Sequence, residues 1–357
     1  MLFIAGLNLK NLHPRVWDPA SPYYLSQLRA VMVSYAEFHA RPPARKKAME
    51  MGLRAFLGVP EHVKVFLDNG AFSFLRNGKS VPEEDYVAFV EKARPDLYVV
   101  PKDLIPAPHL PAEEQRERMR ITMTVNRQYT YDGFIPVLHI SPLLDEYLEA
   151  FFQDAKLAAK PIVALGGIVP NLLRAPKALH PEQILEKLVM ARQRLKGKHI
   201  HVFGVGGTAT LHLTFLLGMD SVDSSSWRNR AARGIVLLPG RGERSVVQLG
   251  SWKGRALSQE EEDLLRRCSC PACKRHGFEH LAARGSEGFY HRAVHNLWVL
   301  LEELKAIEEH IRAGTYEAWF RQHLQNSLYR KWIERAWALR KRADLGGYQR
   351  IDEGRAT

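Results

Sequence analysis

Short apolar runs alternate with longer amphipathic segments through residues 1–222 of the chain. Each run has four or five residues, which is too short for a helix, and most are bounded by Gly, Pro, Asp or Asn. Strands that alternate with helices indicate a parallel sheet, and eight such units over about 220 residues predict a (β/α)8 TIM barrel of the α/β class. A doubly wound sheet is the alternative. The eight runs are residues 2–5, 31–35, 63–67, 97–100, 134–138, 162–165, 200–203 and 219–222. The helical segments between them include residues 83–93, 112–125, 144–158 and 181–195.

A different pattern begins after residue 234. Residues 235–238 and 245–249 are predicted to form an antiparallel pair around a turn at 239–242, since Pro and Gly favour tight turns. A helix at residues 297–311 follows. This part of the chain therefore predicts an addition to the barrel and not a continuation of it.

The chain has three cysteines, and all of them fall within this addition. Cys268, Cys270 and Cys273 lie within six positions and are followed 22 residues later by His295. Three thiolates and one imidazole complete the tetrahedral ligand set of a structural Zn²⁺ with no open position, so we expect one Zn²⁺ per chain. A reduced, metal-free cluster is the alternative. Other histidines compete for the fourth position: His276, His280 and His291.

These changes divide the chain into three predicted parts. A barrel at residues 1–240 is followed by a zinc-binding subdomain at 241–315 and a basic helical tail at 316–357.

The net charge of the chain indicates the kind of partner that it binds. The formal net charge is +12 over 357 residues, and a basic protein of this size commonly has a polyanionic partner, with nucleic acid the first candidate. A solvated, charge-rich surface is the alternative. Residues 41–47 form the clearest basic loop. No apolar run is long enough to cross a bilayer, and clustered cysteines favour a reducing compartment, so we expect a cytoplasmic protein with no membrane contact.

Carboxylates stand at three predicted strand ends. In a parallel barrel, functional side chains sit at the carboxyl ends of strands, and Asp68, Asp103 and Asp223 all occupy such positions. Asp is also common there as a cap or turn residue, which is the alternative for each one singly. Glycines at 166–167 and 204–207 would let a flat ligand approach the backbone closely. The sequence thus predicts one ligand site lined by acidic groups.

Several segments, in order, resemble the tRNA-guanine transglycosylase superfamily between about Val63 and Trp298. Residues 68–72, Asp-Asn-Gly-Ala-Phe, are similar to the family's Asp-Ser-Gly-Gly-Phe. The remaining matches are Asp103, Leu165-Gly166-Gly167, His-Val-Phe-Gly-Val-Gly at 201–206, Asp-Ser-Val-Asp at 220–223, the arginine loop at 230–234 and the cysteine cluster with His295.

The resemblance implies a (β/α)8 barrel with a zinc subdomain that exchanges guanine in nucleic acid for a 7-deazaguanine base. Asp223 is then the nucleophile and Asp68 the general acid and base. The residues implied to bind the base are Asn69, Asp103, His139, Gly166, Gly167, Gly204 and Gly206. The residues implied to hold phosphates are Arg228, Arg230 and Arg233.

Departures from the family pattern concern the base pocket. Asn69 and Ala71 replace a serine and a glycine, His139 stands where a glutamine is expected, and Ile-Val-Pro at 168–170 replaces Ala-Val-Gly-Glu of queuosine-forming bacterial enzymes. These features look closer to the DpdA-like branch, whose members insert 7-deazaguanines into DNA.

We therefore expect a DNA-guanine transglycosylase that uses preQ0 or a similar base. A tRNA-guanine transglycosylase is the first alternative. A non-catalytic zinc-containing subunit that binds nucleic acid is the second, although it would be expected to lose one of the two catalytic carboxylates. A homodimer or a helper protein is a further expectation.

Overall fold

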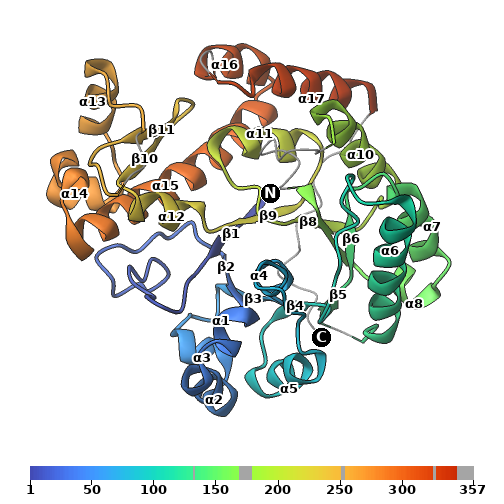
Figure 1. Cartoon of the computed structure of the whole chain (residues 1–357). Helices are drawn as coiled ribbons and strands as arrows, with labels where there is room; N and C mark the ends of the chain where they lie inside the picture. The colour runs from blue at the N-terminus through green and yellow to red at the C-terminus, as the bar shows by residue number, and fades with distance from the viewer. Residues whose placement is uncertain (132, 169–178, 251–253, 325–326, 344–357) are drawn as a thin grey trace.

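A ring of parallel strands surrounded by helices forms the body of the molecule (Figure 1). The computed structural model describes residues 1–357 apart from 132, 169–178, 251–253, 325–326 and 344–357. The sheet has the order β5-β4-β3-β2-β1-β9-β8-β7-β6. Its strands are β1 (Leu2–Gly6), β2 (Ala30–Ser34), β3 (Lys64–Asp68), β4 (Leu97–Val99), β5 (Phe134–Ile135), β6 (Val137–His139), β7 (Ile162–Gly166), β8 (His199–Val202) and β9 (Ser221–Ser224).

The ring closes through one strand that a proline divides. β5 pairs with β4 and β6 pairs with β7, and only Pro136 separates β5 from β6. Proline has no N–H to donate, but its carbonyl accepts from the Ala164 N–H at 2.9 Å. Val137 N–H turns to the Asn126 side chain at 3.1 Å. The predicted eight-stranded (β/α)8 barrel is confirmed, with its fifth strand broken in two, and the doubly wound sheet is excluded.

Alternation along the strands sorts side chains between two apolar layers. In β1, Ile4 faces a small cluster with Met32 and Phe66, whereas Phe3 and Ala5 belong to the larger layer beneath the helices. This period of two is what a closed sheet with a filled interior requires.

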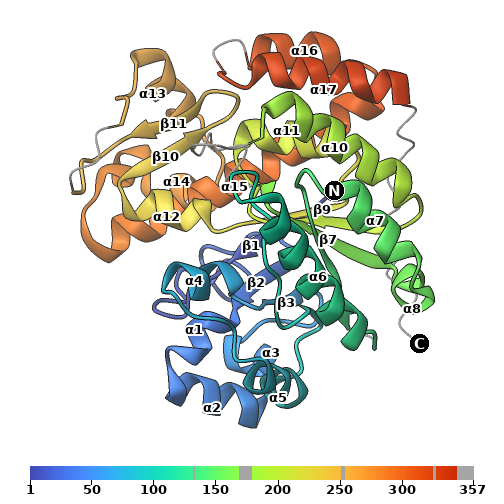
Figure 2. The same ribbon diagram turned by 45° about the vertical axis from the view of Figure 1, so that its right-hand side comes forward.

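Helices cover the outside of the ring (Figure 2). The predicted segment 83–93 is α5, but 144–158 is divided, because Asp154 caps a new helix by accepting from Lys156 N–H and Leu157 N–H at 3.0 Å each. The basic loop predicted at 41–47 is wrong, since Pro42 starts a helix there. The barrel helices are α1 (Tyr35–His39), α2 (Pro42–Met51), α3 (Leu53–Leu57), α4 (Ala71–Arg76), α5 (Glu83–Ala93), α6 (Ala112–Gln128), α7 (Leu144–Phe152), α8 (Ala155–Ala159), α10 (Pro181–Arg194), α11 (Thr208–Leu216) and α12 (Ser226–Ala232).

The added part begins with a hairpin and continues as helices. β10 (Ile235–Leu238) pairs antiparallel with β11 (Gly242–Ser245), so the second strand starts three residues earlier than predicted and the turn is shorter. The elements that follow are α13 (Gln259–Arg266), α14 (Pro271–His276), the 3₁₀ helix η1 (Phe278–Ala282), α15 (Gly285–Arg312), α16 (Tyr316–His323) and α17 (Arg330–Ala343).

The long helix α15 joins this part to the barrel. It packs against α11, α12, α14 and β10, and α17 lies along α10 and α11 (Figures 1 and 2). The division of the chain into three parts stays a prediction, and positions 344–357 of the predicted tail lie outside the described residues. Among the helices described, none combines the length and apolarity that crossing a membrane requires.

Candidate active site

Three carboxylates meet at the carboxyl end of the barrel. Asp68 ends β3, Asp223 lies in β9, and Asp103 follows β4 by four residues. The pKa of Asp68 is raised to about 7, first by burial and then by the negative charges of Asp223 and Asp103. Carboxylates that influence one another in this way share one site, as the strand positions predicted.

Asp68 is held by the backbone and by the neighbouring strand. Its Oδ2 accepts from Gly70 N–H at 2.9 Å, and Ser34, its register partner in β2, also hydrogen-bonds to it. Gly70 has φ of 80°, and an added Cβ would lie 2.5 Å from the Ala36 Cβ, so only glycine fits this turn. The turn fixes one carboxylate oxygen of Asp68.

Asp223 receives two contacts on the same oxygen. Gly204 N–H donates to Oδ1 at 2.7 Å, and His201 Nε2 lies 3.4 Å from that atom. Gly204 has φ of 71°, which turns its N–H toward the carboxylate in a conformation that favours glycine. Among the described residues, both contacts fall on Oδ1, so Oδ2 is the oxygen without a protein donor.

His201 connects Asp223 to a second histidine through a serine. Its Nδ1 lies 3.0 Å from Ser221 Oγ, which is 2.8 Å from His199 Nε2. Burial lowers the pKa of His199 to about 3, so this ring is neutral. Neither histidine was predicted to have a role. Residues two apart on a strand share one face, and this spacing is the signal that could have linked them to Asp223.

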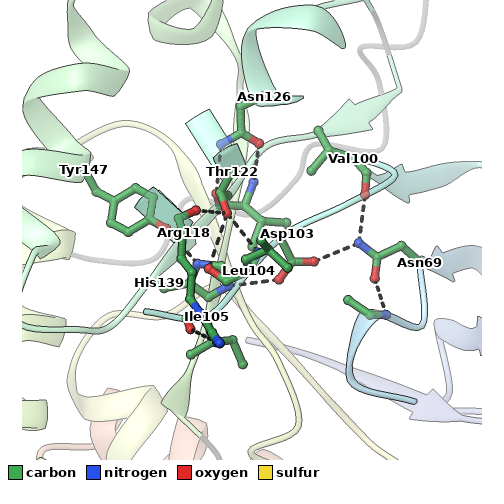
Figure 3. A network of polar contacts seen from close by, with 12 residues as sticks. Asn69, Val100, Asp103, Leu104, Ile105, Arg118, Thr122, Asn126, His139 and Tyr147 are labelled. Atoms are coloured by element: carbon green, nitrogen blue, oxygen red, sulfur yellow. Dashed lines mark hydrogen bonds and ion pairs between the residues drawn. The ribbon is translucent and has the colours of Figure 1, made fainter. Parts of the chain in front are cut away.

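Asp103 is the centre of a second network (Figure 3). Asn69 Nδ2 donates to its Oδ1 at 2.8 Å, and His139 Nε2 donates to its Oδ2 at 2.9 Å. Burial alone would raise the pKa of Asp103, but the hydrogen bond and charge of His139, with the Asn69 hydrogen bond, lower it. The His139 ring is fixed in turn by Tyr147, whose hydroxyl lies 3.1 Å from Nδ1. Asp103 is therefore an ionised, oriented acceptor.

Helix α6 holds the loop that carries Asp103. Thr122 Oγ1 accepts from Leu104 N–H at 2.9 Å, and the Arg118 guanidinium donates to the Ile105 carbonyl at 3.1 Å (Figure 3). These contacts were not predicted, because a loop without secondary structure gives no sequence signal of its anchors.

The predicted glycines stand where side chains would collide. A Cβ on Gly166 would lie 2.9 Å from the His139 ring, and one on Gly206 would lie 2.4 Å from the Ser224 Cβ. Gly167 has φ of 78°. The predicted departure from the family pattern at 168–170 falls partly outside the described residues, which exclude Val169 and Pro170.

The three predicted phosphate-binding arginines differ in their surroundings. Arg228 is 5% exposed, and its Nη2 donates to the carbonyls of Asn11 and His13, so its burial and these two bonds argue against the expected contact with phosphate. Burial lowers its pKa to about 10. Arg230 forms an ion pair with Glu243. Arg233, at the end of α12, is exposed.

The cysteine cluster has the geometry of a tetrahedral zinc site. The sulfurs of Cys268, Cys270 and Cys273 lie 3.4, 3.7 and 3.6 Å from His295 Nδ1. Zinc with bonds of about 2.3 Å to sulfur and about 2.0 Å to nitrogen places such atoms about 3.6 Å apart. The other imidazole nitrogen, Nε2, lies 2.9 Å from the Leu237 carbonyl, which orients the ring. The residues fit Zn²⁺ and select His295 over the competing histidines.

Next to this cluster, Asn296 joins three elements. It is fully buried, accepts from Leu237 N–H at 2.7 Å, and donates to the carbonyls of Ile235 and Trp227 at 3.0 and 3.2 Å. The sequence pair His-Asn therefore holds the hairpin β10–β11 and α12 against α15.

Comparison with known proteins agrees with this architecture. The family model described as Queuine tRNA-ribosyltransferase matches residues 21–328. The chain is 26% identical over 283 residues to the tRNA-guanine(15) transglycosylase of Pyrococcus abyssi, covering 77% of this chain and 44% of that protein. It is 27% identical over 300 residues to the tRNA-guanine(15) transglycosylase of Methanopyrus kandleri, covering 82% and 59%. The chain spans about half the length of the curated relatives it matches. With most of its length matched, the chain belongs to the queuine tRNA-ribosyltransferase family.

Proposed function

We propose that the protein is a guanine transglycosylase, which exchanges guanine in a nucleic acid for another purine-like base. The observation that carries this proposal is the pairing of Asp68 and Asp223 at one barrel face, where the charge of Asp223 helps to raise the pKa of Asp68 to about 7. A carboxylic acid that is half protonated near neutral pH and a second, oriented carboxylate are what a double displacement at a sugar carbon requires.

In the first half-reaction, Asp223 Oδ2 attacks C1′ of the target nucleotide, and the bond from C1′ to guanine N9 breaks. Asp68 gives its proton to the departing base, so guanine leaves as a neutral molecule and an ester joins the sugar to Asp223. Gly204 N–H, 2.7 Å from Oδ1, keeps the other oxygen aimed at the sugar.

In the second half-reaction, the ionised Asp68 takes a proton from N9 of the incoming base. That nitrogen attacks C1′, the ester bond breaks, and the Asp223 carboxylate is restored. Two inversions at C1′ retain its configuration. Protons and bonds balance, because each base that enters releases the proton that the previous base took.

The Asp103 network supports recognition of the purine edge. Each oxygen of Asp103 accepts one protein hydrogen bond and keeps lone pairs for the N–H groups of a base. Phe72, the first aromatic residue after the Asp68 turn, is 68% exposed on α4 and offers a face on which a base extruded from its stack could lie. The Cys268, Cys270, Cys273 and His295 cluster would hold Zn²⁺ as a structural ion away from these steps.

Two nucleic acids are candidates for the substrate. The relatives carry the name tRNA-guanine(15) transglycosylase, which supports tRNA. DNA is the second candidate, supported by the departures at Asn69, Ala71 and His139, two of which lie directly on Asp103. The same departures leave a 7-deazaguanine such as preQ0 as the proposed incoming base.

The test is exchange of labelled guanine into unmodified tRNA and into duplex DNA under identical conditions, with Asp223→Asn as the inactive variant. Asp145→Asn, which alters an exposed carboxylate of α7, is the matched control. Label in one polynucleotide identifies the substrate. Binding of either polynucleotide without exchange by the wild type would instead support the non-catalytic subunit.

A further inference from the structure

A buried cluster of two histidines and a glutamate lies apart from both the carboxylate site and the cysteine cluster. His212 belongs to α11, Glu303 to α15, and His323 ends α16. Their atoms His212 Nε2, Glu303 Oε1 and His323 Nε2 lie within 4.8 Å of one another, with 2.9 Å from the first to the second and 2.7 Å from the third to the second. Three separate helices thus bring three donor atoms to one point.

The buried carboxylate of Glu303 needs a positive charge nearby to offset the cost of its burial. Glu303 is 2% exposed and His212 is fully buried, and the ion-pair partners recorded for Glu303 are these two histidines. A buried carboxylate is costly in an apolar surrounding unless a positive charge, from a protonated imidazole or from a cation, compensates it. A divalent cation would compensate it and use all three atoms as ligands.

The surroundings orient the two rings as the ligands of a metal site are oriented. The Tyr316 hydroxyl lies 2.7 Å from His212 Nδ1, so the outer nitrogen of that ring is held while Nε2 points inward. The Trp319 indole stacks on His212 at 5.5 Å and on His323 at 4.6 Å between ring centroids. The His323 side chain is 19% exposed, so the cluster reaches solvent through this residue.

We propose that His212, Glu303 and His323 form a second metal site, which binds a divalent transition ion such as Zn²⁺ with a water as the fourth ligand. Two imidazoles and one carboxylate are a common ligand set for zinc with an open position. Zinc bonds of about 2.0 Å require donor atoms about 3.3 Å apart. The two separations from Glu303 Oε1, 2.9 and 2.7 Å, would therefore each widen by about half an ångström on metal binding.

A bound ion would link α16, through His323, to the barrel helix α11, through His212. His212 lies in α11, which begins directly after Gly204–Gly207, the segment that positions Asp223. Because metal affinity for the folded chain adds to its stability, the site would stabilise both the C-terminal helices and the start of α11.

A second histidine cluster, formed by α14 and the first turns of α15, is a weaker candidate and serves as a control. His276, Glu287 and His291 also group their donor atoms, but Glu287 is exposed, and the Tyr23 hydroxyl lies 2.9 Å from His291 Nε2 and 3.4 Å from His276 Nε2.

The test is metal content of the full chain after saturation with Zn²⁺ and dialysis, measured by elemental analysis beside circular dichroism. We expect two equivalents in the wild type, one in His323→Gln and one in Cys273→Ser. The Gln amide keeps a donor toward Glu303 but is a poor ligand. His310→Gln is the matched control, since His310 stacks on Trp319 at 4.4 Å without reaching Glu303, and it should keep two.

One equivalent in the wild type that Cys273→Ser removes and His323→Gln retains would overturn the proposal. Loss of the second equivalent in His276→Gln, with His323→Gln unaffected, would also overturn it. If His323→Gln does not fold, titration of the wild type with Co²⁺ decides: a second equivalent without thiolate charge-transfer absorption supports the site, and a single thiolate-bound equivalent refutes it.

Discussion

At the residue scale, the proposed chemistry depends on differences in pKa among three neighbouring carboxyl groups. Burial and the charges of Asp223 and Asp103 raise the pKa of Asp68 to about 7, whereas hydrogen bonds from His139 and Asn69 keep the pKa of Asp103 low. Asp103 therefore stays ionised near neutral pH, and Asp68 is the group that changes its protonation state there.

This difference predicts a pH dependence for the first half-reaction. Loss of guanine needs protonated Asp68, so formation of the ester should slow about tenfold per pH unit above about 7. Ser34→Ala removes a hydrogen bond that lowers the pKa of Asp68. In this variant the rate of ester formation should therefore begin to fall at a higher pH than in the wild type. Single-turnover rates between pH 5 and 9 measure both. If the pH at which the rate falls is unchanged or lower in Ser34→Ala, the assignment of this pH dependence to Asp68 is contradicted.

His201 is predicted to position Asp223. Because its Nε2 lies 3.4 Å from Oδ1, His201→Asn should lower kcat about tenfold, or about 1.4 kcal/mol, with little change in KM for the base. His199→Asn, one serine farther away, should have a smaller effect. Steady-state kinetics of the two variants provide the comparison. Equal losses in both, or a loss confined to KM, would assign His201 to packing alone.

At the element scale, the strands were predictable and several of their details were not. Buried parallel strands are commonly continuous apolar runs, which is why the early strands stand out in the sequence. The last strand, β9, reads Ser-Val-Asp-Ser and begins two residues after the predicted run at 219–222. The break at Pro136 and the register of β10 with β11 depend on partner strands that a single segment does not reveal.

Some residues of the candidate site were predictable from the sequence, and others were not. Asp68, Asp103 and Asp223 follow from their places at strand ends. The burial of Arg228 depends on carbonyls of residues 11 and 13, more than 200 positions away, which no local pattern indicates.

The junction of hairpin, α12 and α15 is predicted to depend on Asn296. Asn296→Ala leaves three buried backbone groups without their partner, so the free energy of unfolding should fall by about 3 kcal/mol. Asn229→Ala, which removes an exposed contact to Ser225 on α12, should change it by less than about 0.5 kcal/mol. Urea denaturation of both zinc-loaded variants is the measurement. Similar stabilities would show that the junction does not rely on this side chain.

At the scale of the whole molecule, the formal net charge is +12, whereas the strand ends of the candidate site carry carboxylates. In the proposed reaction, a positive net charge would attract the polynucleotide electrostatically, while the carboxylates would act on the one nucleotide that enters the barrel.

Among the arginines near the site, Arg233 is predicted to contact phosphate and Arg228 is not. Arg233→Ala should weaken polynucleotide binding and reduce the salt dependence of its affinity by about one unit of slope. Arg228→Met should leave that slope unchanged and lower stability, since its guanidinium serves buried carbonyls. Binding measured between 50 and 300 mM salt tests both. The reverse pattern would place the phosphates at Arg228.

The most direct test of the account is detection of the bond between Asp223 and the sugar. The wild-type protein, denatured during turnover with its polynucleotide, should yield a covalent adduct whose peptide mass places the nucleotide, without its guanine, on Asp223. Asp223→Asn should yield none while remaining folded and able to bind. Base exchange without an adduct, or an adduct that persists in Asp223→Asn, would contradict the mechanism.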